Sequence, residues 1–169
     1  HTRQCAVVLA FVVMDEDGSI FEGKRIPSVE KMMHVLVYKK KEDVNAIIHT
    51  HPLDSAVFAV LHQDIPVICD EMAQAIGGKV RVSEYALPGS MELAENTVKA
   101  LGESRACLLA NHGAVCIGRD IKECFKVAAV LETSANIYAR ALASGRPFEI
   151  SEENTKYMRD FALNRYGQK

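Results

Sequence analysis

The sequence lacks the features that mark several large functional classes. It contains no apolar run near the ~20 residues that cross a bilayer, so no membrane-spanning segment is predicted. It has no Gly-x-Gly-x-x-Gly and no Walker loop, the glycine-rich motifs that cradle nucleotide phosphates. The Gly-x-Ser-x-Gly of α/β-hydrolases is also missing. We therefore expect neither a membrane protein, a nucleotide-binding enzyme nor a serine hydrolase.

A strong excess of charge of one sign is missing as well. The net charge is −2, and the only basic run is Lys39-Lys40-Lys41. This run lies where a helix is expected to end, so it fits a solvated helix terminus that complements the helix dipole. A nucleic-acid surface needs a basic stripe, and we expect no nucleic-acid partner.

Cysteines are few, odd in number and without Cys-x-x-Cys spacing. The five are Cys5, Cys69, Cys107, Cys116 and Cys124, and most lie within apolar segments. Buried free thiols in a reducing compartment fit this pattern better than a disulfide framework. We therefore expect a cytoplasmic protein, and no cysteine shows the surroundings of a nucleophile.

What the sequence does contain is ordinary globular composition with alternating strand and helix patterns. A chain of 169 residues with 49% hydrophobic content suits one domain spanning residues 1–169. Strands are predicted at residues 6–14, 19–23, 46–48, 65–68, 79–85, 106–110 and 114–117, and helices at 28–37, 55–61, 71–76, 90–101, 120–144 and 151–165. The turns at 15–18 and 111–113 are too short for parallel crossovers. We predict a three-layer α/β fold with a mixed, mostly antiparallel central sheet covered by helices.

Two histidines one residue apart follow the apolar strand at residues 46–48. Side chains of an extended chain alternate faces, so His49 and His51 are expected to point to the same side. Two imidazoles held by a rigid strand can bind one metal ion. The alternative is a pair of polar residues at the end of a strand.

A third histidine lies in the tight turn Asn111-His112-Gly113. Gly113 permits the positive φ that such turns often require, and the turn projects His112 from the sheet edge. If the strands at 46–48 and 106–110 are neighbours, three imidazoles converge, which leaves a fourth zinc position open. A turn histidine that bonds a nearby carbonyl is the alternative.

Glu30 is the best candidate for a carboxylate beside these histidines. It could ligate the metal, then leave it and act as a base on a bound substrate. The alternative is a solvent-facing glutamate in the first turn of a helix. His34 lies four residues later on the same helix face and fits a supporting or simply buried residue better than a ligand.

These motifs, in this order and spacing, resemble the class II aldolase/adducin family. The resemblance covers residues 11–166 and includes the Asp-Gly hairpin, Gly-Lys-Arg-Ile-Pro-Ser-Val-Glu30, His-Thr-His-Pro52, Gly77-Gly78, Tyr85-Ala and Asn111-His-Gly113. Within the family, the glutamate at position 30 resembles that of the aldolases of the L-fuculose-1-phosphate type, whereas the epimerases have an aspartate at this position. Adducin-like members lack the metal histidines, and this chain has all three.

The resemblance implies a site and a reaction. His49, His51 and His112 would hold zinc or another divalent transition metal, and Glu30 would move protons on the substrate. Ser28 would contact substrate, and Tyr166, in a matching Tyr-Gly, would close over the site. The reaction implied is cleavage of a ketose 1-phosphate, a small sugar phosphate, into dihydroxyacetone phosphate and an aldehyde. Family members form homotetramers with sites at subunit interfaces.

The resemblance also indicates differences. The loops that hold the substrate phosphate in the family precede the Asp-Gly hairpin, and the residues before Phe11 do not match them. We therefore expect the region with the phosphate loops to be missing from this chain. Glu71 stands where the fuculose-phosphate enzymes have a tyrosine proton donor. Sugar-phosphate epimerisation, dehydration of a methylthioribulose-phosphate-like substrate, and a non-catalytic adducin-like module remain alternatives.

Overall fold

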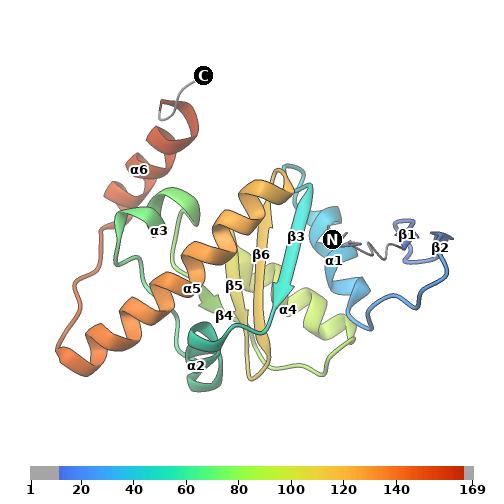
Figure 1. Ribbon diagram of the computed structural model, residues 1–169, viewed down its shortest axis with the longest axis horizontal. Helices are drawn as coiled ribbons and strands as arrows, with labels where there is room; N and C mark the ends of the chain where they lie inside the picture. The colour runs from blue at the N-terminus through green and yellow to red at the C-terminus, as the bar shows by residue number, and fades with distance from the viewer. Residues whose placement is uncertain (1–11, 166–169) are drawn as a thin grey trace, which may run out of the picture.

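The computed structural model describes residues 12–165 as alternating strands and helices around one main sheet (Figure 1). In chain order the elements are β1 (Val13–Met14), β2 (Ile20–Glu22), α1 (Lys31–Lys40), β3 (Ala46–Thr50), α2 (Leu53–Leu61), α3 (Asp70–Ala75), β4 (Arg81–Val82), α4 (Met91–Leu101), β5 (Ala106–Leu109), β6 (Gly113–Gly118), α5 (Ile121–Ser144) and α6 (Glu152–Asn164). Of the predicted first strand, residues 6–11 lie outside the described part. Within the described residues, no helix has the length and hydropathy that crossing a bilayer requires.

The main sheet is mixed and mostly antiparallel, as predicted. Its order is β3-β6-β5-β4, with β6 antiparallel to both neighbours and β4 parallel to β5. The strands at 46–48 and 106–110, whose adjacency was the condition for convergence of the three imidazoles, are not neighbours, because β6 lies between them. β6 pairs along its length with β3, and His49 lies opposite Val115. The hairpin of β1 and β2 forms a separate two-stranded sheet.

Helices cover both faces of this sheet, which confirms the three-layer prediction (Figure 1). Side chains of successive strand residues point to opposite faces, and each face has its own apolar cluster. On one face Leu108 and Cys116 pack with residues of α2, α3 and α5. On the other face Leu109 and Val115 pack with α1 and α4. α6 packs against α3, at the edge of the helical layer that contains α2, α3 and α5.

Two predicted strands are shorter than expected, for identifiable reasons. Residues 65–68 form only an isolated bridge between Ile65 and Val80. Pro66 has no N–H to donate, and the carbonyl of Val67 accepts a hydrogen bond from Ile150 instead of from the sheet. The predicted strand at 79–85 reduces to Arg81 and Val82, and the Val82 N–H donates to the Asp64 side chain.

The starts of two helices also differ from the prediction. α1 begins at Lys31 with Glu30 as its N-cap residue, so Glu30 precedes the first turn. Val29, which falls within the predicted helix at 28–37, is 74% exposed. α2 begins at Leu53, so Asp54 lies in its first turn and does not cap it. The start of α5 agrees with the predicted helix at 120–144, and the Asp120 carboxylate caps it by accepting the Glu123 N–H at 2.7 Å.

Candidate functional site

Three imidazoles meet at the edge of the sheet where β3 ends and β6 begins. His49 is in β3, His51 follows that strand, and His112 lies in the turn between β5 and β6. Their ring centroids are 4.9–5.0 Å apart in every pairing. One nitrogen from each ring lies within 4.8 Å of the others. The structure therefore brings the three histidines together even though the strands at 46–48 and 106–110 are not neighbours.

The register of β3 and β6 explains the convergence. Thr50 pairs with Ala114 in an antiparallel register, so His51, the residue after Thr50, comes beside Gly113, the residue before Ala114. A Cβ on Gly113 would lie 2.4 Å from the Thr50 carbonyl oxygen and 2.7 Å from His51 Cδ2. The close approach of the two strands therefore leaves no room for a side chain at position 113. The predicted positive φ is found at Asn111, where φ is 55°, and not at Gly113.

A backbone carbonyl fixes the tautomer of His49. Its Nδ1 lies 2.9 Å from the Ala114 carbonyl oxygen, which can only accept, so Nδ1 carries the proton. In this tautomer the Nε2 lone pair faces His51 Nε2 at 3.2 Å. Two nitrogens bound to one tetrahedral zinc at ~2.0–2.1 Å are about 3.3 Å apart, so this spacing fits a shared ion.

The Glu30 carboxylate closes the cluster from the start of α1. Its Oε2 lies 3.1 Å from His49 Nε2, and its Oε1 lies 3.4 Å from His112 Nε2. Glu30 is only 7% exposed, and Oε1 has no hydrogen-bond partner among the described residues. A carboxylate oxygen and an imidazole lone pair repel each other unless a proton or a metal cation lies between them. The donor set therefore fits a divalent cation.

Burial keeps His112 ready to act as a ligand. Desolvation lowers its pKa below 6.5, and the positive charge of protonated His49 or His51 would lower it further, while Glu30 acts in the opposite direction. Its Nδ1 is buried without a hydrogen-bond partner in the described part of the chain. A neutral imidazole offers the lone pair that a metal needs.

The remaining predicted residues lie as follows. Ser28 is exposed, and its Oγ accepts the Glu30 N–H at 3.2 Å, which fixes the backbone that carries the carboxylate. His34 is partly buried, and burial lowers its pKa. It lines a separate hollow with Met14 and Tyr38. Tyr166 lies outside the described residues.

Two supporting side chains were not predicted from the sequence. The Glu132 carboxylate, from α5, accepts the N–H groups of Asp54 and Ser55 at 2.6 and 3.0 Å, and so holds the start of α2 directly after His51. His62 donates to the Asn111 side chain at 2.7 Å and so ties the end of α2 to the turn that carries His112. Both partners are more than 40 positions away in the chain, and no local pattern signals them.

Comparisons with known proteins agree with this geometry. The family profile described as class II aldolase and adducin N-terminal domain matches residues 8–139. The chain is 37% identical over 142 residues to a 5-deoxy-D-ribulose 1-phosphate aldolase of Bacillus thuringiensis, covering 84% of this chain and 66% of the relative. It is 36% identical over 124 residues to an L-fuculose phosphate aldolase of Methanocaldococcus jannaschii, covering 73% of this chain and 66% of the relative.

A solved structure of an L-fuculose 1-phosphate aldolase superposes with a TM-score of 0.85 at 38% identity, covering 88% of this chain and 70% of that one. The chain thus spans slightly less than two thirds of the length of these two curated relatives. The profile match, the sequence identity and the shared fold lead to one conclusion: the chain belongs to the class II aldolase and adducin family.

Proposed function

We propose that this chain carries the metal centre of a zinc-dependent aldolase that cleaves a ketose 1-phosphate into dihydroxyacetone phosphate and an aldehyde. The observation that carries the proposal is the convergence of three imidazole nitrogens within 4.8 Å of one another beside a buried carboxylate. The two curated relatives are named as aldolases of ketose phosphates, which supports the same class of reaction.

His49, His51 and His112 would hold the ion, and the fourth position of a tetrahedral site would stay open for substrate. A divalent ion supplies a Lewis acid that polarises the substrate carbonyl. Zinc suits three imidazoles, and manganese or cobalt would suit the same ligands. The availability of each metal would decide which ion is bound. The Ala114 carbonyl keeps the His49 ring oriented, since it accepts the proton on Nδ1.

Glu30 would move protons between the substrate and its own carboxylate. Oε2 faces His49, and Oε1 is buried without a hydrogen-bond partner among the described residues, so the carboxylate would have to turn from the histidines to take a proton from a carbon or hydroxyl of the substrate. Ser28 would contact the substrate from the turn before Glu30, and Tyr166 would close over the site.

We further propose that the chain is one domain and works as a homotetramer with its sites at subunit interfaces. Apolar side chains on α2, directly after His51, support an interface there. Leu53 is 85% exposed and Leu61 is 62% exposed. Exposed apolar side chains that gather on one helix can form an interaction site.

The test measures carbon–carbon cleavage and metal content together. Purified protein is assayed for release of dihydroxyacetone phosphate from L-fuculose 1-phosphate and 5-deoxyribulose 1-phosphate, before and after dialysis against a chelator. We expect activity to disappear with the metal and to return with added zinc. Glu30→Gln should lower turnover by about 100-fold or more with metal retained, whereas the exposed Glu95→Gln should not.

Activity that survives complete metal removal would refute the metal mechanism. Loss of water from the substrate without carbon–carbon cleavage would assign the centre to a dehydratase, and isomer formation alone would assign it to an epimerase. An intact fold with no bound metal would favour the adducin-like alternative.

A further inference from the structure

A second hollow with an unusual charge balance lies at the opposite end of β6 from the histidines. We call it the α5–α6 hollow. Its volume is about 290 Å³, and its wall includes Arg119, Lys122, Lys126, Val127, Arg159 and Leu163. β6 begins beside the histidine cluster and ends at Gly118, one residue before Arg119. Six residues of strand span about 17 Å, so the two sites are separate.

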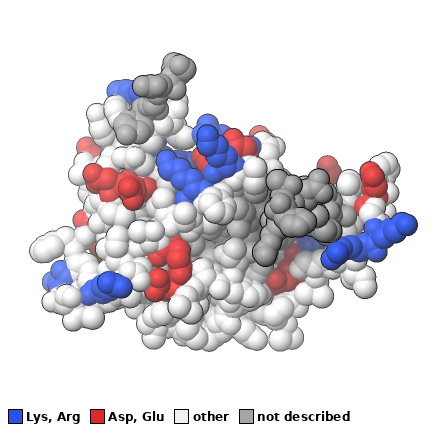
Figure 2. Space-filling view, in the orientation of Figure 1, with Lys and Arg blue, Asp and Glu red and all other residues white. Residues whose placement is uncertain are grey.

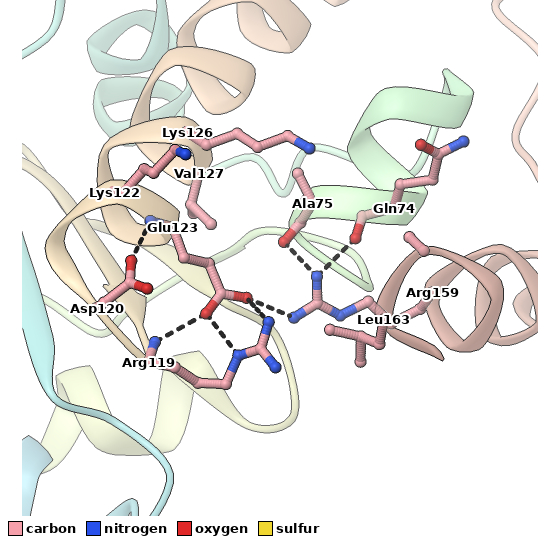
Figure 3. A pocket seen from close by; sticks show the side chains of 11 residues that line it. Gln74, Ala75, Arg119, Asp120, Lys122, Glu123, Lys126, Val127, Arg159 and Leu163 are labelled. Carbon is pink, nitrogen blue, oxygen red and sulfur yellow. Dashed lines mark hydrogen bonds and ion pairs between the residues drawn. The ribbon is translucent and has the colours of Figure 1, made fainter. Parts of the chain in front are cut away.

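The acidic groups of this hollow are already engaged. The Asp120 carboxylate caps α5 by accepting the Glu123 N–H. The Glu123 carboxylate accepts the backbone N–H and Nε–H of Arg119 at 2.8 and 2.9 Å, and it lies 3.5 Å from Arg159 Nη2 (Figure 3). Burial alone would raise the pKa of Glu123, but the bonds from Arg119 hold that pKa below its ordinary value. Both carboxylates therefore already accept hydrogen bonds from groups of the protein.

The basic groups outnumber these carboxylates by two. Lys122 and Lys126 are exposed, lie one helical turn apart on α5, and have no ion pair among residues 12–165. Figure 2 shows a group of basic side chains on this face, between the start of α5 and α6. In Figure 3 the Lys126 side chain extends from α5 toward the α3 side of the hollow.

Arg159 is fixed in place as a donor. Its side chain is only 16% exposed, and Nη1 donates to the carbonyl oxygens of Gln74 and Ala75 at 2.6 and 2.9 Å. These bonds use Nη1 and, within residues 12–165, leave the Nε–H and one Nη2 hydrogen without a strong acceptor. Burial lowers the pKa of Arg159, and the nearby charges of Arg105 and Arg119 lower it further, while Glu123 acts in the opposite direction. The guanidinium is thus crowded by positive charge.

We propose that the α5–α6 hollow binds a phosphate group, held by Lys122, Lys126 and Arg159. A phosphate dianion matches the surplus of two positive charges, and its oxygens accept from a planar guanidinium and from ammonium groups. The volume is small for an organic ligand site. Val127 and Leu163 provide an apolar wall, so the phosphate of a small ester fits as well as free phosphate. This site does not depend on the proposed aldolase activity.

The experiment measures phosphate binding by equilibrium dialysis at constant ionic strength, with inorganic phosphate and glycerol phosphate as probes. A chelator is present in every sample, so that binding at a metal centre does not contribute. Lys122→Gln combined with Lys126→Gln should weaken binding at least about tenfold, because two charge-assisted bonds are lost. The control pair, Lys40→Gln with Lys99→Gln, removes the same charge from exposed positions on α1 and α4 and should change affinity less than about twofold.

Tighter binding of glycerol phosphate assigns the site to phosphate esters, and equal binding assigns it to free phosphate. An equal loss in both variant pairs, or no saturable binding of either probe in the wild type, overturns the proposal. Arg159→Lys keeps the positive charge but loses the planar guanidinium with its paired N–H donors, so it should also weaken phosphate binding. Its unfolding by urea shows whether the fold has survived.

Discussion

Replacing Gly113 by alanine tests whether the histidine cluster depends on the close approach of β3 and β6. The added Cβ would lie 2.4 Å from the Thr50 carbonyl oxygen and 2.7 Å from His51 Cδ2. An ordinary contact is 3.4 Å or longer, so the two strands must separate locally by about 1 Å. The flanking pair of Thr50 and Ala114 leaves little freedom for this movement.

Two consequences follow from that displacement. Overpacking and a weakened ladder should lower the free energy of unfolding by about 3 kcal/mol, measured by urea denaturation of the metal-free protein. A metal site tolerates errors of only about 0.5 Å, so the affinity for zinc should fall at least about tenfold. A competition titration with a chromophoric chelator measures that affinity.

Gly145→Ala is the matched control. Gly145 follows the last residue of α5, its φ of 163° is nearly extended, and no atom of the described residues lies within 4 Å of an added Cβ. The same substitution there should change stability by less than about 0.5 kcal/mol and leave zinc affinity unchanged. If Gly113→Ala binds zinc as tightly as the wild type, the role of this glycine in placing His51 is refuted.

Three further predictions concern residues around the fold. Glu132→Ala should destabilise the protein by about 3 kcal/mol in urea and weaken zinc binding, because the N–H groups of Asp54 and Ser55 lose their acceptor; unchanged zinc affinity would contradict its positioning role. Burial raises the pKa of Cys107 to about 12, so the folded state keeps a proton that the unfolded state loses above pH 9. Stability should therefore fall as pH rises from 9 toward 12, by about 1.4 kcal/mol per unit, and this part of the slope should vanish in Cys107→Ala. Ser90→Ala should cost about 1 kcal/mol, since its Oγ caps α4 through the Leu93 N–H, and a smaller change in the urea midpoint would contradict that role.

The central part of the fold was predictable because local and global signals agree there. Continuous apolar runs at 106–110 and 114–117 became β5 and β6, and every residue of both strands is buried. The tight turn between them requires an antiparallel pair, which fixed the character of the sheet. The long helix predicted at 120–144 is α5, which begins after Asp120 and ends before Gly145.

Errors arose where distant partners or a competing local turn decide the structure. Residues 65–68 have the composition of a strand, yet Pro66 cannot donate and Ile150 takes the Val67 carbonyl. The helix predicted at 28–37 starts later, because the chain forms a turn at Ser28 and Glu30 that leaves Val29 exposed before α1 begins. Ile150 is far from Val67 in the chain and cannot be identified as its partner from local sequence, whereas the turn at Ser28 is a local contact that competes with the helix.

The histidine cluster shows which features of a site can be predicted from the amino-acid sequence and which cannot. The alternation rule placed His49 and His51 on one face, and it needs only local geometry. Placing His112 beside them required the register, because a shift of one residue would move β3 side chains to the opposite face of the sheet. In the structure Thr50 pairs with Ala114, and this pairing brings His51 beside Gly113 and the preceding His112. A glycine is compatible with that register because any side chain would meet the Thr50 carbonyl. The spacing of the three histidines is therefore a property of how two strands pair, and Gly113 is the residue through which the sequence encodes it.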